Sequence, residues 1–179
     1  MSRESKLPIK FVITDVDGIL TPPCFIYTVD GKVAKQFSVS DSLMMDLYVK
    51  FYGVEIIALT GDASGMDVTK RRFSDINLDI DVHECKNSKK AEWVKAFIEL
   101  NGLSKSEVIY LGDDIYDFLV FDEVEWSATV PSALPHIKKF ATYVAERDGG
   151  SSAFSEILWA FAEGQGRDVI ADIEEHAGS

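Results

Sequence analysis

Short apolar runs rich in β-branched residues alternate with amphipathic helical patterns along most of the chain. The runs predict strands over residues 10–14, 54–59, 79–82, 108–111, 127–130 and 143–145. The helical patterns cover residues 42–52, 64–73, 88–101, 117–123, 134–139 and 151–161. Strands that alternate with helices form βαβ units, in which the strands are parallel and the helices cover both faces of the sheet. The sequence therefore predicts an α/β fold, a Rossmann-like three-layer sandwich with a mostly parallel central sheet.

One segment interrupts this alternation. In CFIYTVDGKVAKQFSV, residues 24–39, two strand-like runs flank Asp30 and Gly31, a pair typical of tight hairpin turns. We expect this hairpin, at about residues 24–38, to project from the sheet edge. The chain of 179 residues suits a single domain. We expect that domain over residues 1–163, followed by an acidic tail with a short helix, residues 164–179.

Acidic and polar residues gather where four of the predicted strands end. In chain order they are Asp15 and Asp17; Thr60, Gly61 and Asp62; Lys86, Lys89 and Lys90; and Asp113, Asp114 and Asp117. The carboxyl ends of parallel strands share one edge, which is where open α/β sheets bind their ligands. Each motif alone is a common turn or helix cap. Their occurrence together, each at a strand end, predicts a functional site.

The residue types at this edge indicate phosphoryl transfer. Neighbouring carboxylates repel one another unless a cation lies among them, and carboxylate oxygens with water suit Mg²⁺. An aspartate can also attack phosphorus and form an acyl phosphate. A second carboxylate two residues further on points to the same side of an extended chain and can serve as general acid and base. A hydroxyl and a lysine would hold the phosphoryl oxygens.

The ordered motifs D-x-D-G, T-G, lysine and G-D-D-x-x-D resemble those of the haloacid dehalogenase (HAD) superfamily of phosphotransferases. More narrowly, the segments DVDGILT, KQFSVSDS, ALTGD, YLGDDIYD and DGGSSAFSEIL resemble its capless sugar-phosphatase group, over about residues 8–162. That group includes phosphatases of 3-deoxy-D-manno-octulosonate 8-phosphate (KDO 8-phosphate) and KDN 9-phosphate. It also includes the phosphatase-like tail domains of CMP-sialate synthetases.

The resemblance implies a role for each matching position. Asp15 would be the nucleophile and Asp17 the general acid and base. Thr60 would bind the phosphate, and Lys89 would neutralise charge, with Lys86 and Lys90 as alternatives. Mg²⁺ would be held by Asp15, the backbone carbonyl of Asp17 and Asp113, with Asp114 and Asp117 in supporting positions.

Four further positions are expected to contact the phosphate or the sugar: Ser40, Asp41, Gly61 and Asp62. The group often has arginine where this chain has Ser40 and Asp62. With an acidic residue at position 62 and the run Ser40–Asp41–Ser42, the chain looks more similar to the KDN 9-phosphate enzymes.

The motifs lie too close together for a cap domain. Residues 18–59 separate Asp17 from Thr60, and residues 61–88 separate Thr60 from Lys89. The first gap is filled by the predicted hairpin, a helix and a strand, and the second by a helix and a strand. In the resembling group a neighbouring subunit of a homotetramer covers the site instead. The apolar hairpin residues Phe25, Tyr27 and Val33 suit such a contact, or else they pack on their own domain.

We therefore expect a Mg²⁺-dependent phosphatase that forms an aspartyl phosphate and acts on a 2-keto-3-deoxy acid sugar phosphate of the KDN 9-phosphate or KDO 8-phosphate type. Two alternatives stay open. One is a phosphatase for another small metabolite. The other is a non-catalytic module for oligomerisation or regulation.

Composition excludes other classes. The net charge is −12 and no basic cluster occurs, which argues against nucleic-acid binding. No apolar run approaches the length of a membrane span, and the N-terminus has no signal-like core. Cys24 and Cys85 are too few for a disulfide framework. We therefore expect a cytoplasmic protein.

Overall fold

The computed structural model describes residues 6–178, apart from the side chains of Lys32 and Val33, so the expected contact of Val33 lies outside the described part. The strands are β1 (Phe11–Asp15), β2 (Ile26–Thr28), β3 (Gly31–Ala34), β4 (Glu55–Thr60), β5 (Asp81–Glu84), β6 (Val108–Leu111), β7 (Trp126–Thr129) and β8 (Tyr143–Val144). The helices are α1 (Val39–Asp46), α2 (Met66–Asp75), α3 (Lys90–Leu100), α4 (Asp117–Phe121), α5 (Pro135–Lys138), α6 (Ala153–Gly164) and α7 (Val169–Ala177).

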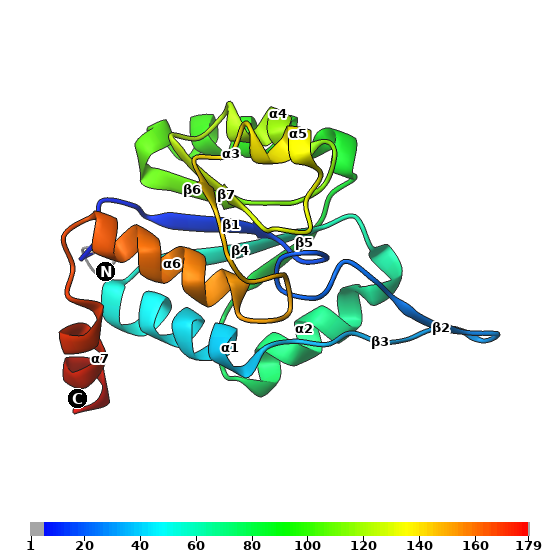
Figure 1. Ribbon diagram of the computed structural model, residues 1–179, viewed down its shortest axis with the longest axis horizontal. Helices are drawn as coiled ribbons and strands as arrows, with labels where there is room; N and C mark the ends of the chain where they lie inside the picture. The colour runs from blue at the N-terminus through cyan, green and yellow to red at the C-terminus, as the bar shows by residue number, and fades with distance from the viewer. Residues whose placement is uncertain (1–5, 179) are drawn as a thin grey trace.

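Six of the strands form a central sheet in the order β5-β4-β1-β6-β7-β8. Every neighbouring pair in it is parallel. Helices α1, α2 and α6 lie on one side of the sheet, and α3, α4 and α5 lie on the other (Figure 1). The predicted three-layer α/β fold with a parallel sheet is confirmed.

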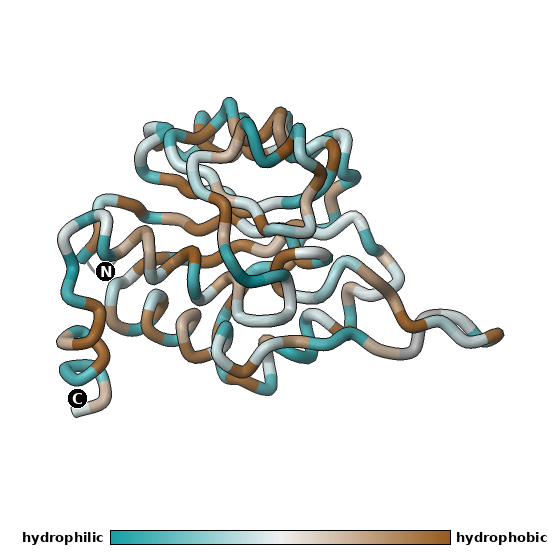
Figure 2. The backbone as a smooth tube through the Cα atoms, viewed as in Figure 1, coloured by the Kyte–Doolittle hydropathy of each residue, from teal (hydrophilic) through white to brown (hydrophobic). Residues whose placement is uncertain are grey.

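Each face of the sheet has its own apolar core, because successive strand residues point to opposite faces. In β1, Val12 belongs to the core beneath α1 and α6, whereas Ile13 belongs to the core beneath α3 and α4. Hydrophobic residues accordingly concentrate along the strands and the inner sides of the helices (Figure 2). By the same alternation, Asp15 falls on the face that α3 covers.

The predicted hairpin is confirmed. Strands β2 and β3 pair antiparallel as a separate two-stranded sheet that projects from the body (Figure 1). Two apolar residues of β2 are exposed, with 59% of Ile26 and 63% of Tyr27 accessible. Apart from this hairpin, the described chain between β1 and β4 holds only helical segments, and α2 with a short 3₁₀ turn separates β4 from β5. Neither gap contains a cap domain.

One segment differs from the sequence expectation, and the tail forms the expected short helix. The helix expected over residues 42–52 begins earlier, as α1, and continues as a π-helical segment, Leu47–Tyr52, that ends at Gly53. The acidic tail forms α7 and packs on the domain, where Tyr52 Oη donates to Asp172 Oδ2 (2.8 Å). No helix in the described part of the chain has the length and apolar character needed to cross a membrane.

Candidate active site

Asp15 ends β1 and is paired with a buried lysine. Its side chain is almost fully buried, and Oδ2 lies 2.5 Å from Nζ of Lys90. The backbone N–H of Val16 donates to Oδ1 (2.7 Å). Lys90 is the first residue of α3 and is fully buried. A carboxylate held by an ammonium and a backbone donor has a fixed orientation toward the carboxyl edge of the sheet.

The structure corrects the prediction of Lys89. The side chain of Lys89 is 58% exposed and pairs with Glu92 on the surface (2.7 Å). A 3₁₀ turn, Asn87–Lys89, precedes α3 and sets the rotation of the helix. Successive helical side chains differ by about 100° around the axis, so only one of two neighbouring lysines can face Asp15. That residue is Lys90, which was one of the two alternatives.

Three carboxylates surround this lysine. Asp15, Asp113 and Asp117 each offer an oxygen, and these atoms all lie within 4.8 Å of one another. Asp117 Oδ1 lies 3.6 Å from Lys90 Nζ and accepts from Tyr110 Oη (2.7 Å), while its Oδ2 accepts from the Asp114 N–H (2.8 Å). Asp117 is thus fixed from three sides, and it both orients the lysine and adds charge to the cluster.

Burial shifts the pKa values of all three carboxyl groups. Burial raises the pKa of Asp15 to about 7, with Lys90 acting in the opposite direction. Burial and the charge of Asp15 raise the pKa of Asp113 to about 8, and burial also raises the pKa of Asp117. Burial alone would lower the pKa of Lys90, but Asp15 and Asp117 outweigh it and raise that pKa. One ammonium is therefore too little positive charge for these three carboxylates, two of which are buried and one partly buried.

These residues fit a divalent metal ion. Asp113 Oδ1 is buried and has no hydrogen-bond partner among the described residues. Gly18 makes room for this carboxylate, because a Cβ at Gly18 would lie 2.2 Å from both oxygens of Asp113, and the φ of +103° at Gly18 suits glycine alone. An unpartnered buried oxygen beside a second carboxylate is the donor set that hard cations use. Asp15 and Asp113 could hold such an ion directly.

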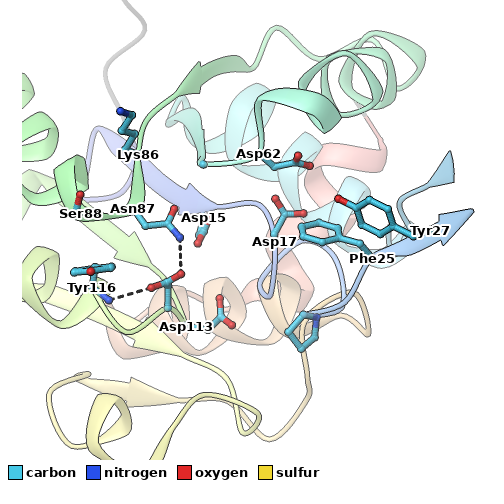
Figure 3. Close-up of a pocket in the computed structure, with 13 residues that line it drawn as sticks. Asp15, Asp17, Phe25, Tyr27, Asp62, Lys86, Asn87, Ser88, Asp113 and Tyr116 are labelled. Atoms are coloured by element: carbon cyan, nitrogen blue, oxygen red, sulfur yellow. Dashed lines mark hydrogen bonds between the residues drawn. The ribbon is translucent and has the colours of Figure 1, made fainter. Parts of the chain in front are cut away.

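The second aspartate of the D-x-D-G motif lies on a different part of the rim. Thr60 Oγ1 donates to Asp17 Oδ2 (3.1 Å) and accepts from the Asp62 N–H (3.0 Å). Lys35 Nζ lies 2.9 Å from Asp17 Oδ1 and 3.1 Å from Asp62 Oδ2. The structure therefore brings Asp17, Thr60 and Asp62 together, as expected. Asp17 and Asp62 both point into the cleft (Figure 3).

Lys35 is a residue of this site that the sequence analysis did not find. It follows β3 at the base of the hairpin and lies 20 residues from the nearest strands of the main sheet, which end at Asp15 and begin at Glu55. The only signal was its place in KQFSVSDS, between the hairpin and a helix. That place does not predict the direction in which the side chain points. Asn87 was missed for a similar reason; its Nδ2 donates to Asp114 Oδ2 (2.5 Å).

The carboxylates of Asp15, Asp17 and Asp113 line one cleft of about 670 Å³. Figure 3 shows the acidic residues on its floor, with Phe25 and Tyr27 of the hairpin on one side and Tyr116 on another. Gly61 belongs to the wall, where a Cβ would lie 2.4 Å from Asn87 Oδ1. The lining consists of Asp15, Asp17, Pro23, Phe25, Tyr27, Gly61, Asp62, Lys86, Asn87, Ser88, Asp113, Asp114 and Tyr116.

Ser40 and Asp41 are not among the residues that line this cleft, and their expected contact with the ligand stays a prediction. Both residues belong to the first turn of α1, and Ser40 is exposed. Asp41 is buried against α6, where its Oδ1 accepts from the N–H (2.9 Å) and Oγ (2.8 Å) of Ser155. A carboxylate that caps the first turn of another helix has a structural role.

The cleft is equipped for nucleophilic attack on phosphorus. Asp15 offers a fixed carboxylate oxygen, Lys90 and a metal ion would neutralise charge on the transferred group, and Asp17 lies on the same rim as a proton donor and acceptor. Thr60, which contacts Asp17, and the backbone N–H of Gly61 in the cleft wall could contact the phosphoryl oxygens.

Comparison with known proteins points in the same direction. A 3-deoxy-D-manno-octulosonate 8-phosphate phosphatase of Haemophilus influenzae is 29% identical over 164 residues, which cover 92% of this chain and 88% of that protein. A cobalt-bound structure of that enzyme from the same organism superposes with a TM-score of 0.77 at 29% identity, covering 89% of this chain and 90% of the other. The enzyme from Moraxella catarrhalis, solved with magnesium, phosphate and KDO, gives a TM-score of 0.78 at 25% identity, covering 89% and 88%.

A family model confirms the resemblance to the haloacid dehalogenase superfamily that the motifs indicated. The model for haloacid dehalogenase-like hydrolases matches residues 69–152. This span includes Lys90, Asp113 and Asp117, and the residues before it supply Asp15, Asp17 and Thr60 in the family's order. The capless α/β fold, the carboxylate cluster and these similarities agree with one another: the chain is similar to the haloacid dehalogenase-like hydrolases in sequence and in structure.

Proposed function

We propose that this protein is a Mg²⁺-dependent phosphomonoesterase that acts on an acid sugar phosphate through an aspartyl-phosphate intermediate. The observation that carries the proposal is the buried contact of Asp15 with Lys90, beside the unpartnered Asp113 oxygen. A carboxylate in this setting is oriented for attack, and its surroundings would neutralise the charge of the phosphoryl group.

The reaction proceeds in two half-reactions. In the first, a carboxylate oxygen of Asp15 forms a bond to phosphorus, the ester P–O bond breaks, and Asp17 gives its proton to the departing oxygen. In the second, water attacks phosphorus and passes a proton to Asp17, the P–O bond to Asp15 breaks, and inorganic phosphate leaves. Lys90 stays charged throughout and neutralises the phosphoryl oxygens.

Mg²⁺ would be held by Asp15, Asp113 and the backbone carbonyl of Asp17, with Asp114 in a supporting position. When bound, it would offset the negative charge of the carboxylates and of the transferred phosphoryl group. Support comes from the carboxylate cluster and from the magnesium in the Moraxella enzyme.

The proposed substrate is KDO 8-phosphate or KDN 9-phosphate. Support comes from the relatives named as KDO 8-phosphate phosphatases. The cleft also suits a polyhydroxylated acid, because it combines hydrogen-bonding groups of Asn87 and Ser88 with the ammonium of Lys86 at its edge. Asp62, whose carboxylate pairs with Lys35, stands where an arginine is common and favours the KDN type.

A panel of sugar phosphates tests this proposal. We expect kcat/KM to be highest for KDO 8-phosphate or KDN 9-phosphate and at least about 10²-fold lower for hexose and pentose phosphates, because contacts with the sugar decide between substrates. Equal values across the panel would favour a phosphatase for another metabolite. If 4-nitrophenyl phosphate is not hydrolysed in Mg²⁺ either, the chain is a non-catalytic module.

Metal removal is expected to abolish activity. After treatment with EDTA and dialysis, the rate with 4-nitrophenyl phosphate should fall to background and return with Mg²⁺. Ca²⁺ should bind but not restore the rate, because its larger and irregular coordination shell would misplace the attacking carboxylate. Full activity after exhaustive chelation would contradict a metal role.

We propose that the protein is a homotetramer assembled through its hairpins. Support comes from the exposed aromatic residues Phe25 (42%) and Tyr27 (63%), which stand beside the cleft on a two-stranded sheet with open edges. A neighbouring subunit would exclude water from a site that no cap covers.

We place this enzyme in the cytoplasm, since Cys24 and Cys85 are both free thiols.

Placing a charge on the hairpin should dissociate the assembly. Tyr27→Asp is expected to give a smaller species by light scattering and to raise KM for the sugar phosphate, while phosphorylation of Asp15 continues. Tyr27→Phe is the matched control and should stay assembled. A wild-type chain that is already a fully active monomer of 19.9 kDa would defeat the proposed assembly.

A further inference from the structure

Lys35 carries a buried ammonium at the rim of the site. The proposed mechanism gives this residue no role. Its side chain is 1% exposed, although it starts from the base of an exposed hairpin. The ammonium contacts both oxygens of Asp17, at 2.9 and 3.1 Å, and Oδ2 of Asp62 at 3.1 Å. It also lies 3.5 Å from Thr69 Oγ1 of α2. The buried ammonium therefore has acceptors on three sides.

The surroundings of Lys35 leave it little freedom. A Cβ at Gly65 would lie 2.5 Å from Lys35 Cε and 2.1 Å from Asp62 Oδ2, so the chain has glycine where these two side chains meet. The ring of Phe25 lies on another side, with its centre 5.9 Å from the ammonium. Long lysine side chains lose conformational entropy when they are fixed, so this order is maintained by packing and by ion pairing together.

The contacts of Lys35 determine where the Asp17 carboxylate lies. Asp17 Oδ2 accepts from Thr60 Oγ1 (3.1 Å), and Oδ1 accepts from Thr21 Oγ1 at the longer distance of 3.4 Å. Lys35 is the cation of this set, and among the described residues it alone contacts both oxygens. Without it, one neutral donor at ordinary distance would hold a carboxylate that can rotate about its χ angles.

We propose that Lys35 is the positioning residue for Asp17. It holds the Asp17 carboxyl in the orientation from which it gives a proton to the departing oxygen and takes one from water. This inference rests on the proposed function, in which Asp15 attacks phosphorus and Asp17 transfers the protons. Because Lys35 follows β3 directly, it also ties the base of the hairpin to the proton-transfer group.

The inference predicts a dependence on the leaving group. When the ester P–O bond breaks, 4-nitrophenolate departs readily as an anion, whereas phenolate is a stronger base and gains more from a proton delivered by Asp17. A variant that misplaces Asp17 should therefore discriminate against phenyl phosphate. The two esters have rings of similar size, so binding differences between them are small.

The test compares Lys35→Met with wild type on both esters in Mg²⁺. We expect kcat/KM for phenyl phosphate to fall about 10²-fold or more, the usual contribution of general acid catalysis, and kcat/KM for 4-nitrophenyl phosphate to fall far less. Attack of water on the phosphoenzyme also needs Asp17, so 4-nitrophenolate should appear in a burst followed by slow turnover. Lys70→Met, an exposed lysine of α2, is the matched control and should behave as wild type.

A second variant guards against a folding defect. Lys35→Met leaves Asp17 and Asp62 without their shared counter-charge, whereas Lys35→Met with Asp62→Asn removes one of the two carboxylates. The double variant should show the same leaving-group dependence and the same burst. An equal fall for both esters without a burst, in a variant that unfolds near the wild-type temperature, would overturn the inference while the proposed function stands. If wild type hydrolyses neither ester, the proposed function fails and the inference fails with it.

Discussion

Asp15→Asn is expected to reduce kcat by about 10⁵-fold or more, because the amide lacks the anionic oxygen that attacks phosphorus. Asparagine has nearly the size and shape of aspartate, and its single amide oxygen can still accept from either the Val16 N–H or Lys90, although not from both. The fold should therefore survive, and the loss should lie in the chemical step. Initial rates with 4-nitrophenyl phosphate and KDO 8-phosphate in Mg²⁺ would measure it.

Asp17→Asn is the comparison that separates the two half-reactions. It keeps the nucleophile, so the rate of phosphorylation of Asp15 should fall less than the rate at which the phosphoenzyme is hydrolysed. Mass spectrometry of the denatured protein should then detect an aspartyl phosphate on Asp15. No phosphoenzyme should form in Asp15→Asn. Near-normal turnover of Asp15→Asn would rule out the covalent mechanism.

Lys90→Met is expected to reduce kcat/KM by about 10³-fold, because it removes a buried cation that faces the transferred group. It should also destabilise the metal-free protein by about 3–5 kcal/mol, since it leaves Asp15 and Asp117 buried without a counter-charge. The raised pKa values of both carboxyl groups mean that protonation would relieve part of this effect. Urea unfolding without metal and steady-state kinetics with Mg²⁺ would measure the two effects separately.

Lys89→Met is the matched control, one residue away on the same helix. Lys89 is mostly exposed and pairs only with Glu92 among the contacts the structure shows, so its loss should change stability by less than about 0.5 kcal/mol and leave the kinetics close to wild type. A large loss in Lys89→Met together with an active Lys90→Met would contradict the assignment of the lysine.

The sequence predicts the fold and the general location of the site because both follow from repeating local patterns. Each buried strand is marked by an apolar run, and each helix by its own periodicity, so the parallel sheet with helices on both faces could be inferred. Strand ends of such a sheet meet at one edge by topology. The proximity of Asp15, Thr60 and Asp113 could therefore be predicted from the sequence.

The sequence does not determine rotations and long-range contacts of single side chains. Lys89 and Lys90 are neighbouring lysines, and from the sequence either could contact Asp15. The 3₁₀ turn before α3 decides which of them does. Asp41 stands in a motif typical of ligand binding, yet α1 packs so that its carboxylate caps α6.

Lys35 shows the same limit most clearly. The sequence by itself determined a hairpin, a βα sheet and a row of aspartates, because hydrophobic periodicity and turn residues act within a few residues of one another. Only the tertiary structure decided that the lysine at the hairpin base turns inward to Asp17 and Asp62. The packing of three segments that are distant in the sequence fixes that direction, since their charges and volumes must be satisfied together.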